Sequence, residues 1–215
     1  MSMNDSIIKE ACVETIGQCK LAQGFGADRL ELCRRLDLDG LTPDQKTIKR
    51  AIESVSIPLK VMVRPREGNF IYNTEELTTM EKQIDLCKSF DIKEVVFGIL
   101  TPNKAIDVIS MQRLVERSFP MSVTFHKAID QTLDILKELD RLALISGITS
   151  ILTSGGKKTA KDGSKMLRAI IKNFSNRFNI IVAGSITKDN LTSLHHDIRS
   201  KEYHGRKIVG QLHHG

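Results

Sequence analysis

Cysteine and glutamate side chains stand together near the ends of the first two apolar segments of this sequence. The segment IIKEACVE contains Glu10, Cys12 and Glu14, and the segment RLELC contains Glu31 and Cys33. In an extended chain every second side chain points to the same side, so each cysteine shares a side with a nearby glutamate. Cys12 and Cys33 are therefore candidate metal ligands or reactive thiols, and small core residues are the alternative for both.

A second group of polar side chains suits anion binding and proton transfer. The segment LKVMVRPR contains Arg64 and Arg66, whose planar guanidinium groups match carboxylate or phosphate. The segment VTFHKAID contains His126, and an ordinary histidine exchanges protons near neutral pH. We expect Asp130 or Glu14 to orient it. The predicted catalytic residues are His126, Asp130 and Glu14, and the predicted anion-binding residues are Arg64, Arg66, Lys127, Ser154 and His204.

Short apolar segments alternate with longer amphipathic segments along the chain. The short segments are apolar on both faces, as parallel strands covered by helices must be. The pattern predicts strands at 7–14, 29–33, 59–66, 94–100, 121–126, 149–155, 179–186 and 202–210. It predicts helices at 16–27, 43–55, 74–90, 106–119, 133–146, 163–177 and 188–200.

This alternation predicts a single domain, residues 1–215, folded as an α/β TIM (β/α)8 barrel. A doubly wound open sheet is the alternative, but no G-x-G-x-x-G turn follows the first predicted strand. Only QLHHG follows the last strand, so the last helix should be missing or rudimentary. We expect a second subunit or the N-terminal segment to cover that flank.

The carboxyl ends of barrel strands meet at one mouth, where catalytic groups gather. The polar strand ends should therefore converge there. Charged side chains inside a barrel need partners, so a structural ion-pair lattice is the alternative for Glu10 and Glu31. Cys19 and Cys87 occupy apolar positions of predicted helices and should pack in the core.

Composition limits the choice of function. The net charge is +6 with 27% charged residues, and the basic residues are spread along the chain. No nucleic-acid-binding motif is present, so we expect no nucleic-acid partner. The N-terminus lacks the apolar stretch of a signal peptide, and no segment matches a membrane span. We therefore expect a cytoplasmic protein with reduced cysteines and no membrane partner.

Eight motifs, taken in order, resemble the CutC family of copper homeostasis proteins. They are KEACVE, GADRLELC, GLTP, VRPREGNFIY, VFGIL, VTFHKAID, ILTSGG and EYHGRKI, within residues 8 to 209. The resemblance implies a TIM barrel, a cytoplasmic location, a homo-oligomer, for which we expect a dimer, and Cu(I) bound by Cys12 and Cys33. Asn69, Ala183 and Ser185 depart from the family pattern, and the last two weaken a phosphate site after the seventh strand.

Two functions from different classes follow. The first is a cytosolic Cu(I)-binding protein linked to copper homeostasis, because soft Cu(I) prefers thiolate ligands. The alternative is a TIM-barrel enzyme of unknown reaction that acts on a small anionic substrate at the barrel mouth. A barrel that binds its ligand without converting it is a third reading, so the sequence leaves enzyme activity open.

Overall fold

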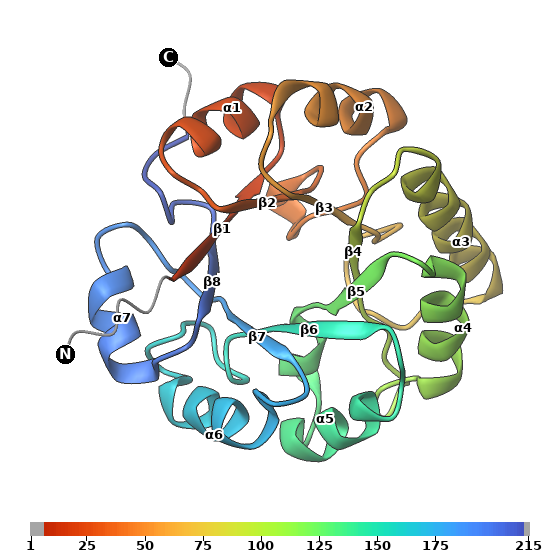
Figure 1. Ribbon diagram of the computed structural model, residues 1–215. Coiled ribbons are helices and arrows are strands. Elements are labelled where there is room, and N and C mark those ends of the chain that lie inside the picture. Colours follow the sequence, from red (N-terminus) through yellow and green to blue (C-terminus); the bar gives the residue numbers. More distant parts are fainter. Residues whose placement is uncertain (1–6, 213–215) are drawn as a thin grey trace.

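The computed structural model describes residues 7–212, which form a closed barrel of eight parallel strands in the order β1 to β8. Figure 1 shows the strands as an inner ring surrounded by helices. The strands are β1 Ile8–Val13, β2 Arg29–Leu32, β3 Leu59–Met62, β4 Glu94–Phe97, β5 Ser122–Phe125, β6 Ile148–Thr153, β7 Asn179–Val182 and β8 Glu202–Gly205. The predicted TIM barrel is confirmed.

Seven α-helices cover the barrel within the described residues. They are α1 Ile16–Gly24, α2 Gln45–Ser54, α3 Thr74–Ser89, α4 Val108–Ser118, α5 Ile135–Ala143, α6 Ser164–Phe174 and α7 Leu191–Ile198. Two 3₁₀ helices, η1 Leu36–Leu38 and η2 Lys127–Gln131, lie in loops at the carboxyl ends of strands. Local sequence sets the helix starts: Thr15 before α1 and Asn73 before α3 each form a capping box with the side chain three residues later.

All eight predicted strands are longer than the observed ones, and the largest differences are in β3, β7 and β8. The strand predicted at 179–186 ends at Val182. The strand predicted at 59–66 ends at Met62, and the strand predicted at 202–210 ends at Gly205. The apolar pattern continues past Met62 because Val63 is still fully buried, but the chain then turns into a loop. Arg64 and Arg66 are therefore loop residues, and their predicted place in a strand is wrong.

A buried ion network lies inside the barrel toward the amino ends of the strands. Lys60 Nζ lies 2.8 Å from Glu94 Oε1 and 3.2 Å from Glu10 Oε2, and Arg29 bridges Glu10 and Glu202. We call these five residues the Lys60 network. Burial alone would raise the pKa of Glu10, but Lys60, His204 and Arg29 together hold it well below its ordinary value. The predicted ion-pair lattice is confirmed for Glu10.

The flank between β8 and β1 is covered by the chain itself. Within residues 206–212 there is no α-helix, which agrees with the prediction for the last helix. Ile208, Val209 and Leu212 are buried in the main hydrophobic core instead. Figure 1 shows this segment, in blue, between α7 and α1. The chain after β8 thus supplies cover that the sequence analysis did not expect, while a second subunit on this flank stays a prediction and the first six residues lie outside the described part.

Two further sequence-based expectations concern the helices. Cys19 in α1 and Cys87 in α3 have no exposed surface and belong to the main core, as predicted. Within residues 7–212, no helix combines the length and apolar character needed to cross a bilayer.

Candidate functional site

A cavity of about 840 Å³ opens at the carboxyl ends of the strands. Parallel strands bring residues from distant parts of the chain to this mouth. The predicted site residues that line the cavity are Cys12, Cys33, Arg64, His126, Lys127, Asp130 and His204. Glu14, Arg66 and Ser154 do not line it. The convergence expected from the sequence is therefore present for most of the group.

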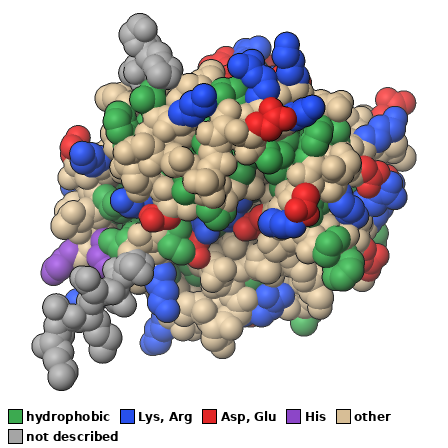
Figure 2. All heavy atoms as spheres, turned by 45° about the horizontal axis from the view of Figure 1, so that its top comes forward, with side chains coloured by type: hydrophobic (Ala, Val, Ile, Leu, Met, Phe, Trp, Pro, Cys, Tyr) green, Lys and Arg blue, Asp and Glu red, His purple; other side chains and the backbone are tan. Residues whose placement is uncertain are grey.

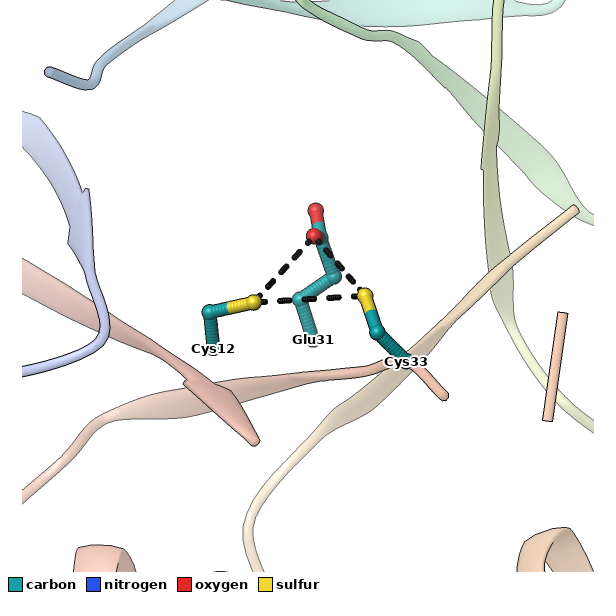
Figure 3. A group of neighbouring side chains, drawn as sticks. All are labelled: Cys12, Glu31 and Cys33. Atoms are coloured by element: carbon teal, nitrogen blue, oxygen red, sulfur yellow. Dashed lines mark hydrogen bonds between the residues drawn. The ribbon is translucent and has the colours of Figure 1, made fainter. Parts of the chain in front are cut away.

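Cys12, Cys33 and Glu31 form a compact cluster at the end of β1 and β2 (Figure 3). The two Sγ atoms lie 3.9 Å apart, and Glu31 Oε1 lies 3.8 Å from Cys12 Sγ and 3.5 Å from Cys33 Sγ. All three side chains are buried. One carboxylate oxygen and two sulfur atoms thus face a common point.

Strand register explains why these three side chains meet. In the β1–β2 pair, Cys12 lies opposite Glu31, and the Cys33 N–H donates to the Val13 carbonyl just beyond the strand end. The following loop returns close to Cys33. A Cβ at Gly40 would lie 3.1 Å from Cys33 Sγ, and Gly40 has a φ of +86°, so glycine is favoured there on both counts.

The cluster has strongly perturbed acidities. Hydrogen bonds from Cys33 and His204 lower the pKa of Cys12 to about 5 against the effect of burial. The hydrogen bond with Cys12, together with burial, raises the pKa of Cys33 well above its ordinary value. Burial raises the pKa of Glu31 to about 8. At neutral pH the cluster therefore favours one thiolate, one thiol and a protonated carboxyl group.

His204 links this cluster to the Lys60 network. Its Nδ1 lies 2.8 Å from Glu10 Oε1, and the ring is close enough to the Cys12 thiol for each to shift the pKa of the other. Burial opposes its charging, but Glu31, Cys12 and Glu10 raise the pKa of His204 well above its ordinary value. His204 is thus a cation held between a carboxylate and a thiolate, which are its partners within the described residues.

His126 lies at the end of β5 and caps η2. Its Nδ1 accepts a hydrogen bond from the Ala128 N–H at 3.2 Å. Burial, with a contribution from Arg64, lowers the pKa of His126 to about 3. Burial thus favours a neutral imidazole near pH 7, and a catalytic role for His126 stays a prediction.

Neither carboxylate proposed to orient His126 contacts it. Asp130 accepts hydrogen bonds from Thr153 Oγ1, Ser154 and the Gly156 N–H, so it organises the loop after β6. Glu14 accepts from the Arg35 N–H at 2.7 Å. The proposed arrangement of His126 with Asp130 or Glu14 is not what the fold provides.

The predicted anion-binding residues separate into two groups. Arg64 is 4% exposed, and its guanidinium donates to three backbone carbonyls, those of Leu38, Gly40 and Gly68. Lys127 lines the cavity beside it. Arg66, in contrast, is paired with Glu76 of α3.

Ser154 is fully buried and donates to Asp130 or to the Lys157 carbonyl. Its hydroxyl therefore already has protein partners.

Sequence reasoning missed part of the site. The lattice offered as the alternative for Glu31 does not form, because within residues 7–212 it makes no salt bridge and contacts both thiols. The spacing of two placed Glu31 on the same side as Cys33, but the sequence analysis did not include Glu31 among the site residues. Phe70, Lys158 and Arg206 also line the cavity. They come from loops, where strand alternation gives no guidance.

Charges on the outer surface are mixed. Figure 2 shows Lys and Arg side chains interspersed with Asp and Glu over the face in view, without one continuous basic patch. The net positive charge is therefore dispersed on this face, which is typical of a solvated surface.

Comparisons with known proteins agree with the motif resemblance. The sequence profile of the CutC family matches residues 7–209. A CutC family protein of Pasteurella multocida (strain Pm70) is 33% identical, over 94% of this chain and 88% of the relative. A copper homeostasis protein cutC homolog of Dictyostelium discoideum is 36% identical, over 94% of this chain and 82% of the relative.

Solved structures give the same result. A structure from Streptococcus agalactiae, described as a copper homeostasis protein CutC, has a TM-score of 0.88 and 32% identity, covering 94% of this chain and 99% of that one. Phosphoribosylanthranilate isomerase from Thermotoga maritima has a TM-score of 0.58 and 11% identity, covering 93% of this chain and 86% of that one. The second likeness concerns the fold alone.

Proposed function

Because this chain belongs to the CutC family, we propose that it binds Cu(I) through Cys12 and Cys33 and serves copper homeostasis. The observation that carries the proposal is the separation of 3.9 Å between the two Sγ atoms at the cavity wall. Metal–thiolate bonds are about 2.3 Å long, so one ion can bridge sulfurs up to about 4.6 Å apart. The pair needs no rearrangement to meet this limit.

The chemistry of the donors favours a soft ion. Cu(I) prefers thiolates over harder oxygen ligands. Cys12 and Cys33 supply two sulfurs, and the nearby Glu31 is neutral near pH 7, which makes it a poor partner for a hard cation. Glu31 and His204 would hold the sulfur atoms in place from outside the ion, as groups around metal sites commonly do.

The proposal includes a cytosolic location. All four cysteines are free thiols, and the reducing cytosol keeps thiols available to metals. We further propose a homodimer. Ile109, Phe119, Leu133 and Leu144 are each at least 78% exposed and lie on or beside the consecutive helices α4 and α5. Large apolar side chains exposed on two consecutive helices favour an interface.

The test of the copper site is a Cu(I) titration of reduced protein against a competing chelator. Cys12→Ser and Cys33→Ser should each weaken Cu(I) binding by at least about 100-fold, since each removes a thiolate. Cys19→Ala, which removes a core cysteine, is the matched control and should keep the wild-type affinity. Unchanged affinity in both serine variants would refute the thiolate site, and tighter binding of Zn(II) than Cu(I) would refute the choice of metal.

A further inference from the structure

Arg64 carries a buried charge that lacks a counter-ion. Its guanidinium contacts backbone carbonyls of Leu38, Gly40 and Gly68, and among residues 7–212 no carboxylate lies within salt-bridge distance of it. Its Nε is buried and has no hydrogen-bond partner among these residues, and the buried Tyr72 hydroxyl near Arg64 is unpaired as well. Buried charges are normally paired, because the loss of hydration is otherwise uncompensated. This part of the cavity wall therefore favours an anion.

His126 presents a second donor without an acceptor. Its Nδ1 already accepts from the Ala128 N–H, so a neutral ring must carry its proton on Nε2. Nε2 is buried and has no partner in the described residues. Since the pKa is about 3, this N–H remains a donor throughout the physiological range. His126 is thus suited to hold an oxygen atom, and not to remove a proton.

Phe70 contacts the side chains of both Arg64 and His126. Its ring lies 4.9 Å from the Arg64 guanidinium and 4.7 Å from the His126 ring. All three side chains line the cavity.

The rest of the cavity wall favours an anion. Lys127, Lys158, Arg206 and Lys207 also line it, against the acidic Glu31, Asp39 and Asp130. Asp130 accepts hydrogen bonds from the loop after β6, and Lys127 and Arg206 lie within salt-bridge distance of Asp130 and Asp39, respectively. Lys158 and Lys207 have no carboxylate at that distance among residues 7–212, so their charges are available to an anion. The volume of about 840 Å³ is in the range of pockets for small organic molecules and far exceeds a single metal ion.

We propose that the cavity binds a small oxyanion, a carboxylate or phosphate compound, through Arg64 and His126. The site goes beyond copper binding, because it uses other side chains and a different ligand. Arg64 provides the charge, and His126 donates from Nε2 to an oxygen atom. The cations at the rim attract the ligand.

The experiment is isothermal titration of metal-free, reduced protein with inorganic phosphate and with malonate. At least one probe should bind saturably, and the stronger probe distinguishes phosphate from carboxylate chemistry. Arg64→Gln and His126→Gln should each weaken binding at least about tenfold. Arg50→Gln on α2 removes the same charge at an exposed position outside the cavity and should leave binding unchanged. Absence of saturable binding, or equal weakening by Arg50→Gln, would overturn the proposal.

A second measurement does not depend on the folding of the variants. In wild-type protein labelled with ¹⁵N-histidine, the Nε2–H resonance of His126 should be that of a neutral ring and should shift on adding the probe, while exposed His196 stays fixed. An unshifted His126 with bound probe would refute the site. The Cys12→Ser/Cys33→Ser protein should retain probe binding within about twofold, so failure of the copper site and failure of the anion site are separable.

Discussion

Replacing Lys60 by methionine should be among the most destabilising single changes in this barrel. Lys60 is 1% exposed, and its ammonium group contacts Glu10, Glu94 and Thr124. Methionine fills a similar volume without charge, so the substitution leaves buried carboxylates short of a cation. Removing one partner of a buried ion pair costs about 3–5 kcal/mol. For a chain of this size, that lowers Tm by roughly 10 °C.

The pH dependence gives this prediction a second check. The pKa of Glu10 is depressed in the folded protein, so its contribution is present above the unfolded carboxyl pKa of about 4.3 and is lost as pH falls further. In Lys60→Met the pKa of Glu10 rises toward the unfolded value. The stability difference between variant and wild type should therefore be largest at pH 7 and shrink below roughly pH 4.

Urea unfolding at pH 7 and at about pH 2.5, well below the unfolded carboxyl pKa, measures both effects. Arg113→Gln is the control, because it breaks an ion pair with Glu81 in which Arg113 is 46% exposed, and such surface pairs contribute less than about 1 kcal/mol. If Lys60→Met cost no more than Arg113→Gln at pH 7, or if its cost were the same at both pH values, the reasoning about the Lys60 network would be refuted.

Three further predictions concern the site and the surface. Burial raises the pKa of Glu31 to about 8, above its unfolded value, so wild-type protein should lose stability as pH rises from about 4.5 to 8. Glu31→Gln should abolish this loss. If urea unfolding gave both proteins the same change in free energy of unfolding with pH, the prediction would be contradicted. A methyl group on Gly98 would lie 2.7 Å from His126 Nδ1. Gly98→Ala should therefore lower the free energy of unfolding by about 1–3 kcal/mol and weaken malonate or phosphate binding. Gly24→Ala, at a position with open space around it, is the control and should have neither effect in the same assays. Phe119→Glu combined with Leu144→Glu should convert a dimer to monomers in sedimentation velocity, and an unchanged sedimentation coefficient would place the interface elsewhere.

The barrel was predictable because its signal is repeated. Each strand is a short buried run followed by an amphipathic helix, and errors at one boundary do not affect the others. Strand ends were less predictable, since buried residues continue into the loops. Val63 is as buried as the strand before it, although the strand ends at Met62. Because strand alternation stops at Met62, Arg64 and Arg66 do not have to share a side, and their surroundings differ entirely.

The pairing of Cys12 with Cys33 was also within reach of sequence reasoning. Both lie near the ends of neighbouring strands, and the observed register brings them together. The pKa values of the site residues were not predictable from the sequence, because they depend on burial and on contacts between distant segments. His126 looks like an ordinary histidine in sequence, and only its burial beside Arg64 makes it a permanently neutral donor.

The segment after β8 serves two purposes at once. Residues 208–212 insert apolar side chains where an eighth helix would pack, while Arg206 and Lys207 form part of the cavity wall. The same stretch of backbone therefore closes the barrel between β8 and β1 and forms part of the cavity wall. Ligand binding in the cavity should slow amide hydrogen exchange in β8 and β1. A bulky fusion placed directly after this stretch would disturb both ligand binding and barrel closure.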